Sequence, residues 1–297
     1  MNLDDIRFTP ELRLINDKQI ERIDGAIMDV LERTGIQMTH KKALDLLDGA
    51  GARVDGNKVK IPSWMVKKAL TTAPSRINLG NRFGKTAVTL GGRRNWFGPS
   101  LDCIYWQDPA TNERTRYTSE HCRQIARLAE HCDNYTWTMV IGMADDHPPE
   151  SADKVIIRRV FENTTKPFVF CCNDMESVKA TYEMALLAQG GKEVFDTAPL
   201  GVHYSEPISP LVYFDPAVEK LIYCAENRIP LIYFPAPQCS GTAPATLAGN
   251  VVLGAAESLS GLVLHQLVNP GASFIFGAYT TVMNMQTSIF SYGAAEM

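Results

Sequence analysis

The chain has 297 residues, of which 45% are hydrophobic and 21% are charged, and its formal net charge is -4 at pH 7. This composition is ordinary for a globular protein, and the absence of any Lys/Arg block argues against a nucleic-acid-binding surface. The charged start lacks the apolar segment of a signal peptide, and apolar runs such as Leu231 to Pro237 are far shorter than the roughly 20 residues that cross a bilayer. We therefore expect a cytoplasmic protein that binds neither nucleic acid nor membrane.

The seven cysteines do not indicate a disulfide framework. Their number is odd and no CxxC motif occurs, which is typical of reduced thiols. His121-Cys122 and His131-Cys132 stand on one expected helix, about three turns apart, which is too far for them to share a metal ion. The sequence therefore predicts no metal site.

Residues 1–117 are expected to form an N-terminal extension of helices and strands. Apolar spacing predicts helices over about 16–33 and 41–47, and a third helix follows Pro62. Alternating residues around Asp55-Gly56-Asn57 predict a hairpin. The rest of the extension is expected to be rich in strands, because Gly, Asn and Arg separate the short runs RINLG, TAVTL, NWFG and DCIYWQD.

From residue 118 onward, short apolar runs alternate with longer helical segments. Apolar strands that alternate with helices indicate βα units and a parallel sheet buried on both faces. The five expected strands lie within Thr136–Met143, Pro167–Asn173, Pro199–Ser205, Pro230–Ala236 and Ser273–Tyr279.

The spacing of these runs indicates the kind of parallel sheet. The first four begin about 31 residues apart, which matches a (β/α)8 barrel of roughly 250 residues. We therefore predict an α/β protein of the (β/α)8 TIM-barrel type, with about five βα units in residues 118–297 and the C-terminal part of the barrel incomplete. The final residues, SIFSYGAAEM, look like the start of the next helix. An open five-stranded sheet remains an alternative, but no glycine-rich nucleotide-binding motif supports a doubly wound fold.

Three segments are similar to the trimethylamine methyltransferase family. They are NWFGPSLDCIYWQD, HYSEPISPLVYF with Ser209-Pro210-Leu211, and a long segment from FPAPQCSGTAP to GAYTT, which holds the Pro-rich loop Pro235–Pro244, Leu247-Ala248-Gly249, Glu257, Pro270-Gly271 and Gly277. Together with IPSWMVKKALTTAPSRINLGNR, the resemblance extends from near the N-terminus to the last residue. The long segment is the most specific of them.

This resemblance implies a methyltransferase built on a (β/α)8 barrel with an N-terminal extension. It would move a methyl group from a methylated amine, trimethylamine or a betaine such as glycine betaine, to Co(I) of a corrinoid carried by a partner protein, a reaction of one-carbon metabolism and methanogenesis. No cofactor is expected to bind this chain directly. The pyrrolysine of the trimethylamine branch would lie beyond Met297. The alternatives are a non-catalytic amine-binding or corrinoid-docking relic and an unrelated barrel aldolase or lyase, whose Schiff-base version is weakened because no Lys occurs in the five strands.

A quaternary ammonium accepts no hydrogen bond, so its site needs aromatic faces and carboxylates. In a barrel these side chains stand at the carboxyl ends of the strands. Tyr279 ends the fifth run, Tyr204 and Glu206 end the third, and Phe97 lies in a segment of the resemblance. We expect these four residues to contact the substrate, although aromatic residues in strands are more often part of the core.

Three further residues are candidates for substrate binding. His203 lies inside the third strand, as a buried, satisfied histidine or as a donor to a substrate carboxylate. Gln238 lies in the Pro-rich loop, solvated or at the barrel mouth. Glu296 stands where the family usually has a Glu, although Ala295 before it departs from the pattern. Cys171 and Cys172 are expected to pack inside the second strand.

Two expectations concern the substrate and the assembly. The trimethylamine branch has smaller residues where Ala278-Tyr279 stand and Asp where Asn284 stands, so the larger aromatic favours glycine betaine over trimethylamine. An unclosed barrel would expose sheet edges, which favours a homo-oligomer.

Overall fold

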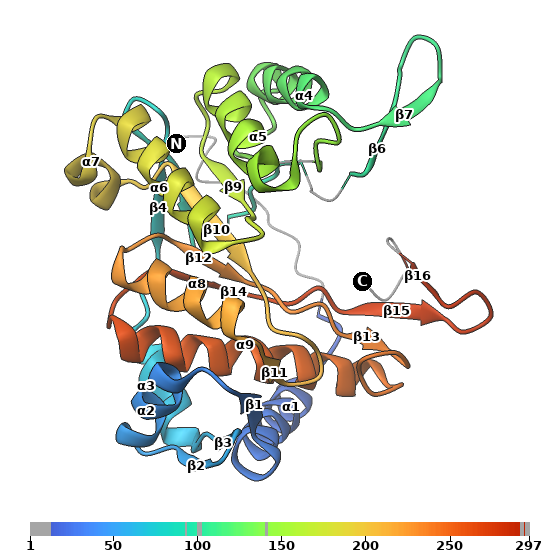
Figure 1. Ribbon diagram of the computed structural model, residues 1–297. Helices are drawn as coiled ribbons and strands as arrows, with labels where there is room; N and C mark the ends of the chain where they lie inside the picture. The colour runs from blue at the N-terminus through green and yellow to red at the C-terminus, as the bar shows by residue number, and fades with distance from the viewer. Residues whose placement is uncertain (1–12, 93, 100–102, 140–141, 292–293, 295–297) are drawn as a thin grey trace, which may run out of the picture.

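The computed structural model describes residues 13–297 apart from 93, 100–102, 140–141, 292–293 and 295–297. A parallel sheet forms its centre, in the order β14-β12-β10-β9-β8, and helices cover one of its faces (Figure 1). The strands are β8 (Thr138–Met139), β9 (Phe168–Phe170), β10 (Gly201–Ser205), β12 (Leu231–Tyr233) and β14 (Phe274–Phe276). All five lie within the predicted runs, and each pairs in parallel with its neighbour in sequence. The α/β class is confirmed, but among the described residues β8 and β14 do not pair to close a barrel.

Helices follow the first four strands of this sheet, as predicted, and another helix precedes β8. Polar caps begin several of them: the side chains of Thr118, Asp174 and Thr246 each accept a hydrogen bond from the third residue of the helix that follows. The helices are α4 (Ser119–His131), α5 (Pro149–Asn163), α6 (Met175–Gln189), α7 (Lys192–Thr197), α8 (Asp215–Glu226) and α9 (Leu247–Val268).

The two faces of the sheet are buried differently. Phe168, Phe170 and Tyr233 face the helices in the larger core cluster. Alternate residues such as Val169 and Val202 face the other way, against the hairpin of β4 (Ile77–Gly80) and β5 (Thr86–Leu90). The Gly80 N–H donates to the Pro199 carbonyl, just before β10, so the hairpin covers the amino ends of the strands.

The N-terminal part packs against α9 and joins the C-terminal part through a shared small sheet. Its β1 (Ile36–Met38) pairs in parallel with β11 (Val212–Tyr213), which follows β10. Because this sheet joins residues from both sides of position 117, the predicted domain boundary there stays a prediction. The elements are α1 (Asp17–Asp29), a π-helical turn (Val30–Thr34), β1 (Ile36–Met38), α2 (Lys41–Gly49), β2 (Arg53–Asp55), β3 (Lys58–Lys60) and α3 (Ser63–Thr72).

Two sequence predictions need correction, one of a strand and one of a helix. The run NWFG forms only an isolated bridge between Phe97 and Tyr135, while an unpredicted β7 (Arg114–Arg116) pairs with β6 (Tyr105–Gln107). The expected helix at the end of the chain is wrong over Ile289–Ser291, which form β16 against β15 (Thr281–Asn284). The Asn284 side chain accepts N–H groups of the intervening turn, and this turn favours a hairpin.

Helix α9 is, among the described residues, long and apolar enough to cross a membrane by length and composition alone, yet 72% of its most apolar 18-residue stretch is buried in the protein. It packs against α1, α2 and α3 on one side and α8 and β14 on others, which explains its apolar surface all round. Gly261 permits this packing, because a Cβ there would lie 2.5 Å from a ring carbon of Tyr233.

His203 points from β10 toward the helices and is fully buried. Its ring lies 5.0 Å from the ring of Phe170, and neither ring nitrogen makes a well-formed hydrogen bond within the described residues. The histidine is therefore buried as expected, but among the described residues no well-formed hydrogen bond satisfies its ring. Burial, helped by the nearby Lys220 ammonium, lowers the pKa of His203 to about 3, so the imidazole is neutral.

Replacing Gly261 with Ala should lower the free energy of unfolding by about 1–3 kcal/mol, because the new methyl group overpacks against Tyr233. The control is Gly25→Ala in α1, where a Cβ would meet nothing within 4 Å and where the better helix propensity should add about 0.5–1 kcal/mol. Urea unfolding measures both. Changes of equal sign would refute the packing of α9 on β12.

His203→Leu should flatten the acid limb of stability. Because the pKa of His203 is depressed in the folded state, its contribution is present above the unfolded pKa of 6.5 and is lost as pH falls toward 3. The slope of unfolding free energy against pH should become shallower by up to about 1.4 kcal/mol per pH unit in that window. His131→Gln, at an exposed histidine, is the control, and an unchanged slope in His203→Leu would contradict the buried neutral state.

Candidate functional site

Aromatic side chains gather at the carboxyl ends of three neighbouring strands. Tyr204 is the penultimate residue of β10, Phe234 directly follows β12, and Tyr279 lies three residues beyond β14. The rings of Phe234 and Tyr279 pack edge to face with centroids 5.8 Å apart. Tyr279 is 45% exposed, so its ring is accessible from solvent. The structure thus brings Tyr204, Phe234 and Tyr279 to the same edge of the sheet.

A single strand register holds this group together. Ile232 pairs with Ile275 in the sheet, and farther along Gln238 pairs with Thr281, so that the offset is 43 residues at both places (275 − 232 and 281 − 238). Between these pairs the Tyr279 N–H donates to the Pro235 carbonyl at 2.8 Å. The Pro-rich loop therefore runs beside the segment that carries Tyr279, as an extension of the parallel sheet.

Glu206 adds a carboxylate to this aromatic group. The Tyr204 hydroxyl lies 2.9 Å from Glu206 Oε2 and 3.0 Å from the Phe234 carbonyl oxygen, and it can donate to either. Burial raises the pKa of Tyr204, and the Glu206 carboxylate raises it further, so the phenol stays protonated and remains a donor. Glu206 itself is half-buried.

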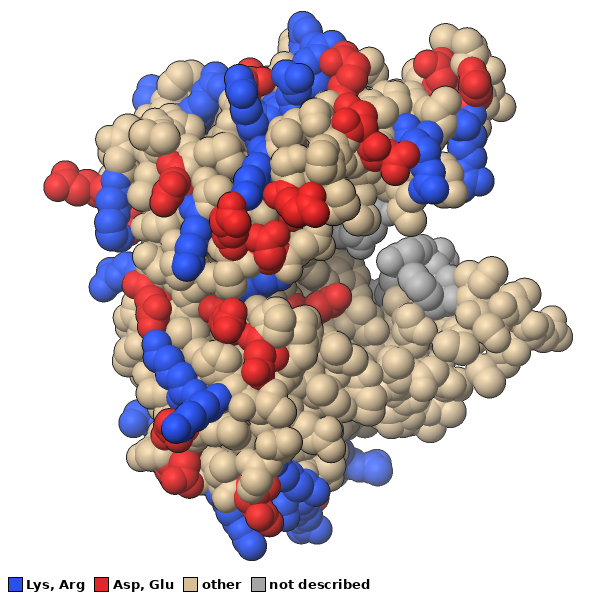
Figure 2. Space-filling model, in the orientation of Figure 1, with Lys and Arg blue, Asp and Glu red and all other residues tan. Residues whose placement is uncertain are grey.

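Aromatic faces beside a carboxylate are suited to a methylated ammonium group, which is attracted to π faces and negative charge but offers no hydrogen bond. The molecule is hollowed between the part that carries β6 and β7 and the part that carries β15 and β16, and an acidic side chain lies within the hollow (Figures 1 and 2). Over the part of the chain that the structure describes, no cluster of three or more His, Cys, Asp and Glu side chains could hold a metal ion.

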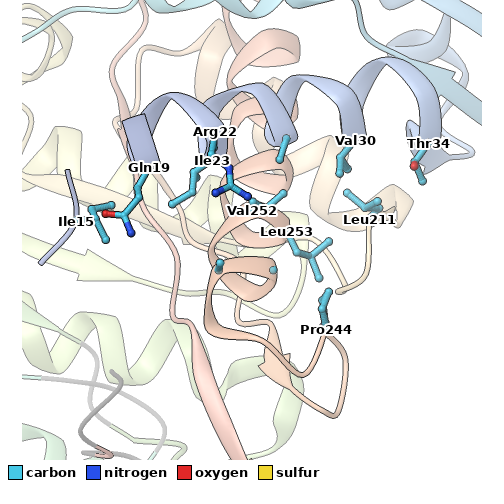
Figure 3. Close-up of a pocket in the computed structure, with 13 residues that line it drawn as sticks. Ile15, Gln19, Arg22, Ile23, Val30, Thr34, Leu211, Pro244, Val252 and Leu253 are labelled. Atoms are coloured by element: carbon cyan, nitrogen blue, oxygen red, sulfur yellow. The ribbon is translucent and has the colours of Figure 1, made fainter. Parts of the chain in front are cut away.

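A separate groove lies between α1 and α9, with a volume of about 610 Å³ (Figure 3). Its lining is mostly apolar and includes Ile23, Val252 and Leu253. It also contains Leu211 and Pro244, which belong to the loops after β10 and β12. The groove therefore adjoins these two loops and lacks an aromatic and acidic lining, so we do not assign it the amine.

The remaining predicted residues lie apart from Tyr204 and Glu206 or outside the described residues. His203 points to the opposite face of the sheet. Phe97 is 67% exposed and pairs with Tyr135 before β8, which places it at the amino ends of the strands. Gln238 is half-buried on β13 (Gln238–Cys239). It pairs with Thr281, which lies two residues after Tyr279. Glu296 lies outside the described residues.

Sequence reasoning gave no role to Glu257 and misjudged Cys171. Glu257, in α9, is fully buried, and its carboxylate accepts hydrogen bonds from Ser209 Oγ at 2.8 Å and from the Leu211 N–H at 2.7 Å. The signal available was an acidic residue inside a long apolar helix. Strand β9 ends at Phe170, so Cys171 lies just after it and is exposed, close to Tyr204. Cys172 packs in the core, as predicted.

Comparison with known proteins identifies related sequences. A family model described as Trimethylamine methyltransferase (MTTB) matches residues 4–297. The chain is 30% identical over 95% of its length to a trimethylamine methyltransferase of Desulfitobacterium hafniense strain DCB-2, covering 57% of that protein. It is 26% identical to a glycine betaine methyltransferase of Desulfitobacterium hafniense strain Y51 and 30% identical to a trimethylamine methyltransferase of Methanosarcina barkeri strain Fusaro, with 97% of this chain aligned in both.

In these two alignments the chain covers 60% and 59% of the relatives, so it spans less than two thirds of the length of the curated proteins it matches. The family match nevertheless runs over nearly the whole chain. The protein therefore belongs to the trimethylamine methyltransferase family.

Proposed function

We propose that this protein moves a methyl group from a quaternary or tertiary methylamine to Co(I) of a corrinoid carried by a partner protein, with glycine betaine favoured and trimethylamine next. Family membership supports the reaction class. The observation that carries the assignment to a site is the Glu206 carboxylate, hydrogen-bonded to Tyr204 beside Phe234 and Tyr279. The other candidate, an amine-binding or corrinoid-docking relic, would use the same residues without turnover.

The chain's own residues bind and orient the amine in this proposal. In the transfer the C–N bond breaks and its electron pair stays on nitrogen, while the methyl carbon accepts two electrons from the partner's Co(I). The positive charge on nitrogen therefore disappears as the reaction proceeds. A carboxylate beside that nitrogen gains nothing further as the charge declines, so Glu206 should contribute to binding and not accelerate the chemical step.

The strand order of the central sheet supports the proposal of a (β/α)8 barrel. Its five strands follow one another in sequence order and all pair in parallel, an order that (β/α)8 barrels also have. We infer that these units are the first part of such a barrel, since the curated relatives are longer than this chain. A structure of the chain together with any coding sequence that follows Met297 tests this, and an open sheet there would contradict it.

The reaction itself can be followed by the visible spectrum of cob(I)alamin under anaerobic, reducing conditions. With glycine betaine, trimethylamine, carnitine and choline tried in parallel, we expect methylcobalamin to form fastest with glycine betaine. The protein should include any sequence that follows Met297 in its coding DNA, and the 297-residue chain should be compared with it. Binding of an amine without methylation by either version, also with a corrinoid protein added, would favour the relic.

Glu206→Gln should raise KM for glycine betaine about tenfold, corresponding to about 1.4 kcal/mol, while kcat changes less than twofold. Tyr279→Ala should also raise KM, because it removes one aromatic face from the cation. Phe83→Ala is the control, since Phe83 is also an exposed aromatic residue but lies in the turn between β4 and β5, away from the proposed amine site. Unchanged betaine turnover in a folded Tyr279→Ala variant would refute the assigned preference for betaine.

A further inference from the structure

Glu257, in α9, forms hydrogen bonds with the loop that follows β10. Its two carboxylate oxygens accept from different residues of the loop, Oε2 from Ser209 Oγ at 2.8 Å and Oε1 from the Leu211 N–H at 2.7 Å. Both donors lie within five residues of Glu206 in the sequence. Glu257 has no solvent exposure, and burial, opposed by these two hydrogen bonds and assisted by the Glu206 charge, raises its pKa.

The loop is fixed from several other directions. Leu211 has a φ of 62°, a left-handed conformation that is uncommon for a leucine and therefore needs support. The Gln37 N–H donates to the Leu211 carbonyl at 2.8 Å, and the Leu211 side chain lies beside Val30 and Thr34 in the groove (Figure 3). The Tyr213 hydroxyl donates to the Glu257 carbonyl. Glu257 thus contacts the loop through its side chain, and it contacts β11, which follows the loop, through its backbone.

A buried carboxylate is costly unless it is paired or well hydrogen-bonded, and apolar residues of similar size would avoid that cost. Glu257 stands in the mostly apolar and buried helix α9, and both of its carboxylate oxygens accept hydrogen bonds from one loop. Glutamine keeps one acceptor oxygen and replaces the other with an NH2 group, so the bond with Ser209 would have to reverse its direction and both bonds would lose the charge of the acceptor. The carboxylate therefore fits a task of positioning that an amide cannot perform fully.

We propose that Glu257 is a positioning residue, which fixes the loop from Glu206 to Leu211 so that the Glu206 carboxylate stays against Tyr204 and faces the methylated ammonium. The proposal rests on the proposed amine site. Glu257 does not touch the substrate in this account. Its influence on amine binding passes through Glu206 alone, and that property distinguishes positioning from general support of the fold.

A double-mutant cycle on amine affinity tests the coupling. Titration calorimetry with glycine betaine is performed on the full chain as wild type, Glu257→Gln, Glu206→Gln and the double variant. Glu257→Gln should weaken binding about 5- to 10-fold when Glu206 is present and less than about 2-fold when it is already Gln, since residues in one network are coupled. Equal weakening in both backgrounds would overturn the proposal, because a merely structural role acts regardless of Glu206.

Glu130→Gln is the matched control. Glu130 accepts hydrogen bonds from the side chains of Thr164 and Thr165 and from the Thr165 N–H, just before β9, so it holds a loop in the same manner at the opposite end of the sheet. Betaine affinity should be unchanged in this variant, and weakening equal to that in Glu257→Gln would overturn the proposal.

Ser209→Ala provides a second variant if Glu257→Gln does not fold, since it removes one of the two hydrogen bonds and leaves the carboxylate in place. It should weaken betaine binding about 2- to 3-fold in wild type and not in Glu206→Gln, the scale of one hydrogen bond. Equal effects in both backgrounds again contradict positioning. If wild type itself binds no betaine or trimethylamine, the amine site fails, which is a different result from an additive cycle.

Discussion

Parallel pairing of consecutive strands is the constraint on which the other features depend. Because all five strands run in the same direction, their carboxyl ends meet at one edge, and residues from distant parts of the sequence become neighbours there. The offset of 43 residues between the last two strands continues past the sheet into their loops. This continuation brings Tyr279 to Phe234, and it places both beside the end of β10, where Tyr204 and Glu206 stand.

The two ends of the sheet differ in what covers them. At the amino ends the hairpin of β4 and β5 packs on the inner face and excludes solvent. At the carboxyl ends a half-buried carboxylate and partly exposed aromatic rings remain accessible. A cation whose charge disappears during the reaction needs such a site for recognition more than for catalysis. This view also explains why a second, fully buried carboxylate is useful for holding the first one in place.

The sequence was sufficient to predict the parallel sheet and the helices between its strands, but not β7 or β16. Apolar runs identified all five strands of that sheet, and strand-end positions suggested Tyr204, Glu206 and Tyr279, which the structure places at one edge. Side-chain direction was harder to predict, because both faces of β10 are buried and the apolar pattern does not reveal which of His203 and Tyr204 faces the helices. Contacts between distant residues were not predictable: Glu257 meets Ser209 across 48 positions, Phe97 pairs with Tyr135, and pairing with β15 turns Ile289–Ser291 into a strand.

The central claim is that this edge of the sheet recognises a positive charge on a methylated nitrogen. The most direct measurement compares the affinity of glycine betaine with that of 3,3-dimethylbutanoate, which has the same shape but carbon in place of the charged nitrogen. The account predicts that betaine binds at least about tenfold more tightly, a difference of about 1.4 kcal/mol, and that Glu206→Gln removes most of this difference. Equal affinity of the two compounds for the wild-type protein would contradict it.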